Sequence, residues 1–364
     1  MTPTRELQDG WTFTQVGGGK VVKDGEWLPV RNFPTTVHVE LLEHKRIPDP
    51  FVGLHEWEVQ WIGEVEWVFK TTFTASETEV AAQNVDLVFD GLDTFAVVKL
   101  NGHRILETEN QFIGHRVPVK QHLHAGGNTL LLAFSSAFRK GREIEEKHRP
   151  VLMTVGPWKP IRLETYTTRI VDLDVRPRVD EKLCAAVDIA FELSKSDRSI
   201  ASVSVNDPDG KVVIGQTDLA IQSERAEAHF KLSAGAFDLW FPVGYGKQPI
   251  YTVEIKITDK DGHLLDSKSQ KFAFRRAIIV QDELEGQEGR SFLFEINNIR
   301  IFCGGSNWIP ADSFLTRLTV ERYRQWLQLL VDGNQNMIRV WGGGIYEADA
   351  FYDICDGSWH VCMP

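Results

Sequence analysis

The stretch from Ile299 to Asp356 switches repeatedly between the hydrophobic periodicity of a strand and that of a helix, and this pattern constrains the fold most strongly. Ile299–Phe302 is short, apolar and β-prone, so we expect a strand that ends at the break Gly304–Ser306. A loop should follow over Asn307–Phe314. The next helix is predicted to start at the N-cap Thr319, because apolar side chains then recur at three- and four-residue steps.

The second half of this stretch repeats the same order of elements. Asp332–Asn334 ends the predicted helix, Met337–Trp341 forms the next predicted strand, Gly342–Gly344 breaks it, and Glu347–Asp356 has helical spacing. Alternation of this kind predicts a parallel sheet with helices outside it, because parallel strands need a right-handed crossover. Two such β/α units are present where an eight-stranded barrel needs eight, so we expect an incomplete TIM barrel.

Upstream of this stretch the chain is predicted to be all-β. Up to about Tyr166, four β-rich runs fit a sandwich or jelly roll, and Asn101-Gly102 is a strong hairpin signal because both residues tolerate positive φ. These runs are Val65–Phe73, Val85–Phe89, Ala96–Leu100 and Thr129–Phe134. Phe138–Pro150 carries many charges of both signs, and we expect a solvated surface segment there.

A second all-β region, from about Thr167 to Arg276, has the strand spacing of an immunoglobulin-like sandwich. Its predicted strands are Ile170–Val175, Leu183–Leu193, Ile200–Val205, Ala226–Leu232, Tyr251–Ile257 and Lys271–Phe274, with turns at Asp207–Gly210 and Asp259–Gly262. The acidic segment Gln281–Gly289 is expected to link this region to the β/α units. We therefore predict three domains, over residues 1–166, 167–277 and 278–364.

The charge and cysteine content limit the partners and the compartment. A formal net charge of -11 argues against nucleic acid or an anionic membrane, because both attract basic patches. No apolar run is long enough to span a bilayer, and the first residues lack the apolar core of a secretory signal, so a cytoplasmic protein is expected. Cys184, Cys303, Cys355 and Cys362 have no CxxC or disulfide-framework spacing, which predicts reduced thiols. The oligomeric state stays open.

Several long motifs resemble one enzyme family. GGSNWIPADSF and NMIRVWGGGIYE are similar to the opening of the catalytic barrel in β-mannosidases of glycoside hydrolase family 2, of the intracellular type. LNGHRILETENQFIGHRVPV, VLMTVGPWKPIRLETY and FPVGYGKQPIYTVEIKI resemble the galactose-binding-like, sugar-binding domain and the immunoglobulin-like domain of the same enzymes. The motifs stand in family order, and nearly all of the chain is covered.

The resemblance implies an exo-acting, retaining hydrolase that removes terminal non-reducing β-mannose without metal or organic cofactor. It implies that Trp341 forms part of the wall of the mannose subsite, that Arg339 and Asn307 shape its floor, and that Trp308 also binds substrate. Glycines at 342–344 carry no side chains, so a ligand can approach the backbone beside the large indole. The alternative is that Trp341 caps the barrel core and the glycines only turn the chain.

The chain as given is predicted to be inactive. Retaining glycosidases need two carboxyl groups about 5 Å apart, and in the family both are glutamates on later barrel strands. Five carboxylates lie near the two loops, and we expect dipole-stabilised helix ends or solvent-facing surface for them instead of catalysis. They are Asp312, Glu347, Asp349, Asp353 and Asp356.

Two departures from the family pattern lead to further hypotheses. His148–Pro150 joins directly to Val151, where the family has a longer segment ending in Trp-Asp-Trp-Gly, and the tail GSWHVCMP departs from the family's helix and next strand. An aberrant transcript or gene model, with a non-functional product, is therefore one alternative. Another is a non-catalytic carbohydrate-binding protein that uses its first β domain.

Three other signals are weaker. Gly342–Gly344 and Gly17–Lys20 both fail the nucleotide-binding patterns, which makes phosphate binding an unfavourable interpretation. His122 and His124 share a spacing suited to metal, but no third ligand has sensible spacing. We therefore expect surface histidines and no metal site.

Overall fold

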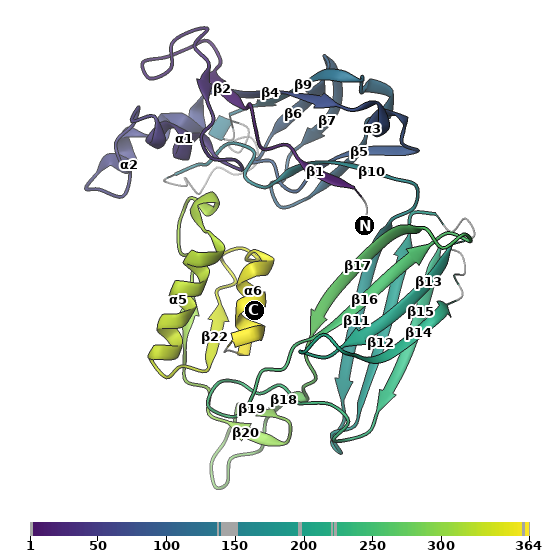
Figure 1. The fold of residues 1–364 in the computed structure, drawn as a ribbon. Helices are drawn as coiled ribbons and strands as arrows, with labels where there is room; N and C mark the ends of the chain where they lie inside the picture. Colours follow the sequence, from purple (N-terminus) through teal and green to yellow (C-terminus); the bar gives the residue numbers. More distant parts are fainter. Residues whose placement is uncertain are drawn as a thin grey trace. The chain divides into compact units, whose positions relative to one another are not determined.

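The computed structural model describes residues 3–136, 138–139, 152–195, 199–219, 221, 224–358 and 361–363 (Figure 1). These residues group into two compact units. One consists of residues 3–167 with 312–317, and the other of residues 168–311 with 318–364. The predicted surface segment 138–150 lies, apart from its first two residues, outside the described part of the chain, as does the junction between His148 and Val151.

The first unit contains an all-antiparallel sandwich. One sheet has the order β1-β10-β5-β8 and the other the order β3-β2-β4-β9-β6-β7. The strands are β1 Thr4–Glu6, β2 Thr12–Gln15, β3 Leu28–Pro29, β4 Trp67–Ala75, β5 Asn84–Phe89, β6 Ala96–Leu100, β7 His103–Thr108, β8 His115–Pro118, β9 Gly126–Phe134 and β10 Ile161–Tyr166. Buried side chains alternate along β4 and β9, as expected for sheets with one face in a core. Trp67, Phe69 and Phe134 are among the aromatic residues of that core.

The predicted hairpin at Asn101-Gly102 is confirmed. Asn101 has φ 51° and Gly102 has φ 85°, and they join β6 to β7. The Asn101 side chain accepts from the Thr129 N–H and donates to the Asn128 side chain and to the His122 carbonyl, which fixes the turn against β9. The two turn residues, which the sequence identifies, therefore fix the pairing of β6 with β7 at this end of the sheet.

Short helical elements complete this unit. They are α1 Val37–Glu43, α2 His55–Glu58, η1 Gln60–Glu64, α3 Glu77–Ala81 and η2 Lys120–His122. The distant segment 312–317, which forms η3 Leu315–Arg317, also belongs to this unit because Phe314 is fully buried against His38 and Phe51. Burial lowers the pKa of His38 to about 4. The ring of His38 therefore packs as a neutral group against Phe314.

The second sandwich begins after β10. Its sheets have the orders β11-β12-β15 and β14-β13-β16-β17. The strands are β11 Ile170–Val179, β12 Ala185–Leu193, β13 Ile200–Asn206, β14 Val212–Leu219, β15 Arg225–Leu232, β16 Tyr251–Thr258 and β17 Leu264–Phe272. The predicted strand at Lys271–Phe274 was wrong in position, because it is only the end of β17, and β14 was not predicted at all. The exposed Val212 and the glycine at 215 weaken the alternation that would have revealed β14.

A small antiparallel sheet follows the second sandwich and corrects two predictions. It consists of β18 Ala277–Val280, β19 Leu293–Ile296 and β20 Ile299–Ile301. Ile299–Ile301 therefore pairs in an antiparallel hairpin with β19 and is not the first strand of the β/α units. Gln281–Gly289 is the loop of the β18–β19 hairpin, closed by bonds such as Ser291 N–H to Asp282 O, and is not a linker.

The parallel segment begins six residues later than predicted. Its elements are β21 Gly305–Trp308, α5 Val320–Asp332, β22 Met337–Val340, α6 Asp349–Ser358 and β23 Val361–Met363. We read Gly304–Ser306 as a break and Asn307 as loop, whereas Gly305 to Trp308 pairs in parallel with β22. The glycine is needed inside the strand because a Cβ at 305 would collide with the Met337 carbonyl oxygen. The end of the chain pairs in parallel with β22 as β23. The expected departure of the sequence GSWHVCMP from the family pattern stays a prediction.

The two predicted helices pack beside the parallel sheet (Figure 1). Thr319 caps α5 by accepting a hydrogen bond from the Arg322 N–H, as predicted, and Gly333 follows its last turn. Tyr323 and Leu327 are buried on its inner face, while Val320 in its first turn is half exposed. Two β-sandwiches followed by β/α units are the predicted fold class, which is confirmed.

Trp240 joins the second sandwich to α6. Its side chain is fully buried, its indole N–H donates to the Asp356 carbonyl at 2.7 Å, and the Arg275 guanidinium lies 4.8 Å from its ring centroid. Arg275 also pairs with the Asp356 carboxylate at 3.7 Å. Burial raises the pKa of Asp356, while the Arg275 charge opposes that shift. The tryptophan therefore has a structural role at this joint.

Candidate functional site

The parallel register brings two predicted site residues together. Asn307 on β21 is the direct neighbour of Arg339 on β22, and both side chains are exposed. The Arg339 Nη1 donates to Asn307 Oδ1 at 3.4 Å. Trp308, Ile338 and Val340 alternate with them and are buried with α5 and α6 in one apolar cluster. One face of this short sheet is therefore a core, and the other presents polar side chains.

Trp341 follows β22 directly and is 45% exposed. Its N–H donates to the Trp308 carbonyl at 2.8 Å, which continues the parallel ladder by one bond. The Gly344 N–H then donates to the Trp341 carbonyl at 3.0 Å and closes a tight turn. The Trp341 indole lies over Gly343, where a Cβ would displace it, whereas the space around Gly342 is open.

Trp308 lies on the opposite side of the sheet from Asn307. It is 6% exposed and packs on Phe351 with ring centroids 5.0 Å apart. Its indole N–H donates to Glu347 Oε1 at 2.8 Å, and the Tyr323 hydroxyl donates to Glu347 Oε2 at 2.7 Å. Burial and then the Glu347 carboxylate raise the pKa of Tyr323, so its hydroxyl stays a proton donor.

Sequence reasoning missed the role of Glu347. We expected this carboxylate at a helix N-terminus, but α6 begins two residues later, and Glu347 is 5% exposed. A signal for this role was present in the sequence. Tyr323 and Trp308 both occur at apolar positions, and a hydroxyl or indole N–H that is buried there needs a hydrogen-bond acceptor such as the Glu347 carboxylate.

The other carboxylates near the loops have identifiable roles. Asp312 pairs with Arg317 at 2.7 Å and accepts from the Phe314 N–H. Asp353 pairs with Lys271 at 3.0 Å, and Asp356 pairs with Arg275. Asp353 is exposed, as expected, whereas Asp312 and Asp356 are partly buried. Asp349 lies in the first turn of α6, where a negative charge is favoured.

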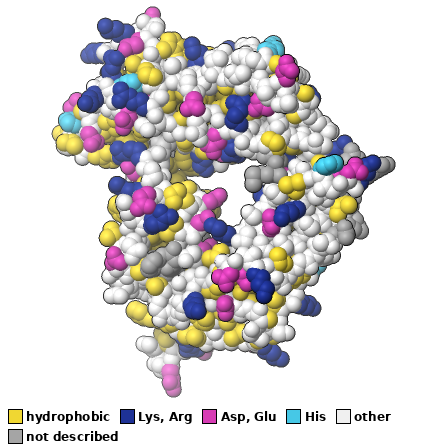
Figure 2. All heavy atoms as spheres, in the orientation of Figure 1, with side chains coloured by type: hydrophobic (Ala, Val, Ile, Leu, Met, Phe, Trp, Pro, Cys, Tyr) yellow, Lys and Arg dark blue, Asp and Glu magenta, His cyan; other side chains and the backbone are white. Residues whose placement is uncertain are grey.

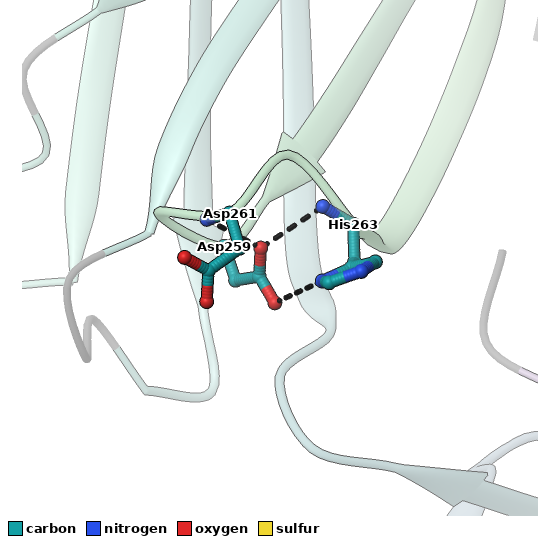
Figure 3. A group of neighbouring side chains, drawn as sticks. All are labelled: Asp259, Asp261 and His263. Atoms are coloured by element: carbon teal, nitrogen blue, oxygen red, sulfur yellow. Dashed lines mark hydrogen bonds and ion pairs between the residues drawn. The ribbon is translucent and has the colours of Figure 1, made fainter.

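Two groups of potential metal ligands, the histidines near η2 and the Asp259–His263 turn, make local contacts instead. His122, on η2, stacks on His103 with ring centroids 4.7 Å apart, and its neighbour His124 is exposed. Asp259, Asp261 and His263 gather at the turn between β16 and β17 (Figure 3). Asp259 Oδ1 accepts from the N–H groups of the other two residues, both at 2.9 Å, and its Oδ2 contacts the His263 ring at 3.1 Å. The carboxylate thus closes a predicted turn.

The surface charges are mixed. On the face drawn in Figure 2, basic side chains are interspersed with acidic ones and do not gather in one field. In the described parts of the chain, no helix has the length and apolar content needed to cross a membrane.

Two antiparallel sandwiches followed by a parallel β/α segment define a modular protein, with polar and aromatic side chains at the ends of the parallel strands. Residues 11–168 match the family described as glycosyl hydrolase 2 galactose-binding domain-like, and residues 168–275 match glycosyl hydrolases family 2. The chain therefore belongs to glycosyl hydrolase family 2.

Curated relatives and solved structures are consistent with this family. The chain is 42% identical to β-mannosidase B of Thermothelomyces thermophilus, over 96% of this chain and 43% of that protein. It is 36% identical to β-mannosidase B of Aspergillus clavatus, over 96% of this chain and 44% of that protein. The chain thus spans less than half the length of these curated relatives.

Among solved structures, β-D-mannosidase from Dictyoglomus thermophilum is similar with a TM-score of 0.88 and 32% identity. This match covers 99% of this chain and 47% of that one. The β-glucuronidase of Bifidobacterium dentium has a TM-score of 0.72 at 18% identity, over 99% of this chain and 60% of that one, which shows a shared fold only.

Proposed function

We propose that this chain supplies the sugar-contacting face of a β-mannosidase, a retaining exo-hydrolase of terminal non-reducing β-D-mannose in β-mannosides such as mannan or N-glycans. The observation that carries the proposal is the exposed sheet face where Arg339 and Asn307 stand in register beside the half-exposed Trp341. Further support comes from the names of the similar proteins, which are β-mannosidases.

Each residue of this face has a distinct chemical task. The Trp341 indole offers an apolar face for the C–H side of a mannose ring. Arg339 donates hydrogen bonds to sugar hydroxyls, and the Asn307 amide can both donate and accept. Trp308, which we expected to bind substrate, is buried, so in this proposal it acts from behind the sheet.

Hydrolysis needs more than this face provides. A retaining mechanism requires an acid and a nucleophilic carboxylate about 5 Å apart. Within the described residues of 299–358, Glu347, Asp353 and Asp356 hold other partners, and Asp349 lies in a helix turn. We therefore propose that the 364-residue chain by itself binds β-mannosides without hydrolysing them, and that it uses no metal or organic cofactor.

The test combines binding with turnover on the purified chain. Calorimetric titration with methyl β-D-mannoside should give saturable binding that Trp341→Ala abolishes. Trp57→Ala, which removes a 61% exposed tryptophan from the first unit, is the matched control and should bind like the wild type. An aryl β-mannoside should show no turnover above background. Absence of binding, or turnover by this chain, would contradict the proposal.

A non-catalytic carbohydrate-binding protein that uses its first sandwich is the competing hypothesis. It predicts that affinity survives both Trp341→Ala and a deletion after about Arg276, and our proposal predicts loss in both.

The domain limits 1–166, 167–277 and 278–364 belong to the same proposal and are testable by expressing each piece. A cytoplasmic location is likewise proposed, with support from the cysteine spacing, which shows no CxxC pair and no disulfide framework.

A further inference from the structure

Trp308 contacts both ends of the loop that carries Trp341. Its carbonyl oxygen accepts the Trp341 N–H at 2.8 Å, at the start of the loop. Its indole N–H donates to Glu347 at 2.8 Å, at the end of the loop. One buried residue of β21 therefore fixes the two points between which the loop 341–347 turns.

Glu347 is held by two donors in an apolar setting. Glu347 is 5% exposed, and each carboxylate oxygen accepts one hydrogen bond, from the Trp308 indole N–H at 2.8 Å and from the Tyr323 hydroxyl at 2.7 Å. Among the described residues, no Lys, Arg or His pairs with it. A buried carboxylate without a cation depends on its hydrogen bonds, so Glu347 has little freedom to leave this position.

We propose that Glu347 is a positioning residue: together with Trp308 and Tyr323 it forms a clamp that holds the loop 341–347 and keeps the Trp341 indole at the exposed sheet face. The clamp stands on its own geometry, and only its effect on sugar binding rests on the proposed function. The clamp matters for this loop because its three glycines, at 342–344, carry no side chains that would restrict the backbone there.

Three substitutions break single bonds of the clamp. Tyr323→Phe removes the hydroxyl donor, and Trp308→Phe removes the indole N–H. Glu347→Gln keeps the shape but replaces one acceptor oxygen by an NH2 group that faces a donor. Tyr346→Phe is the matched control, because it removes a hydroxyl from the same loop at a residue that is 88% exposed.

Fluorine-19 NMR of the full chain labelled with fluorotryptophan reports on Trp341 directly. The resonance that disappears in Trp341→Phe assigns this residue. We expect Glu347→Gln and Tyr323→Phe to shift and broaden it, while Tyr346→Phe leaves it unchanged and circular dichroism confirms folding in all variants. A wild-type Trp341 resonance in folded Glu347→Gln and Tyr323→Phe would overturn the clamp.

Binding separates the clamp from the function it serves. Loss of a hydrogen bond to a charged group typically changes an equilibrium constant about tenfold or more. We therefore expect Glu347→Gln to bind methyl β-D-mannoside with roughly tenfold weaker affinity. If the wild type binds no mannoside but the Trp341 resonance still responds to the clamp variants, the proposed function fails and the clamp stands. If the wild type binds and the resonance does not respond, the clamp alone is wrong.

Discussion

The sandwiches and the parallel segment use the two faces of their sheets in different ways. In each sandwich the inner faces of two sheets share one core, so buried side chains alternate along strands such as β4, β12 and β16. In the parallel segment α5 and α6 share a core with one side of the sheet, and Asn307 and Arg339 stand exposed on the other. Polar side chains can gather there because that side contributes nothing to this core.

Phe351→Ala should produce the largest effect and should sharpen this difference. Phe351 is fully buried between Trp308 and Tyr323, so its truncation is expected to cost about 3–5 kcal/mol. Hydrogen exchange should show loss of protection in β21, β22, α5 and α6, with β4 and β9 unaffected. The matched variant Phe69→Ala should give the reverse pattern. Loss of protection throughout the chain in either variant would mean that the regions unfold as one.

Asp93 provides a pH test that is specific for the first sandwich. Burial raises the pKa of Asp93 to about 6, against the opposing hydrogen bonds from Thr154 and Thr94. Between the ordinary value of 3.8 and about 6 the folded state keeps a proton that the unfolded state releases, so this contribution to stability is lost as the pH rises. Relative to the wild type, Asp93→Asn should gain up to about 3 kcal/mol between pH 4 and pH 7.

Urea unfolding followed at several pH values measures this gain. Asp9→Asn, at an exposed position, is the control and should show no comparable trend. A stability difference between Asp93→Asn and the wild type that stays constant with pH would contradict the assigned titration.

Gly305→Ala tests the corrected position of β21. The added Cβ would collide with the Met337 backbone, so a loss of about 1–3 kcal/mol is expected, confined to the parallel segment. Gly342→Ala is the matched control, because no atom lies within 4 Å of its Cβ position. The measurement is a thermal melt followed by near-ultraviolet circular dichroism. If the two variants have equal unfolding midpoints, residues 305–308 do not form the strand β21, and the loop that we predicted from the sequence is correct.

Thr319→Ala should give the smallest effect. It allows the parallel segment and the first unit to be compared by the loss of one helix N-cap hydrogen bond in each. The Thr319 hydroxyl accepts from the Arg322 N–H at the start of α5, and its removal should cost about 1 kcal/mol. Ser76→Ala removes the equivalent bond at α3 of the first unit and should cost a similar amount there. Residue-resolved exchange should place each loss in its own region, and a loss shared by both regions would show coupling.

The sequence predicted the sandwiches better than the parallel segment for a physical reason. Hairpins such as Asn101-Gly102 are local, and alternation of buried side chains is strong in strands with one face in a core. In contrast, β21 is short and opens with a glycine at a close backbone approach, which reads as a break. The preceding β20 has the stronger local pattern, but it pairs with β19.

In the candidate site, too, some positions could be predicted from the sequence and others could not. Asn307, Arg339 and Trp341 were predicted from family motifs, and the structure places the first two in direct register. The positions of Trp308 and Glu347 could not be predicted, because burial and the Tyr323 hydroxyl bond depend on how α5 packs against β21. Tertiary packing decides whether a polar side chain faces solvent or another side chain.

The most direct measurement is a crystal structure of the 364-residue chain with bound methyl β-D-mannoside. We expect a mannose ring stacked on the exposed face of the Trp341 indole, with hydroxyls within hydrogen-bond distance of Arg339 and Asn307. A mannoside bound only on one of the two sandwiches, with Trp341 free of sugar at saturating ligand, would contradict it.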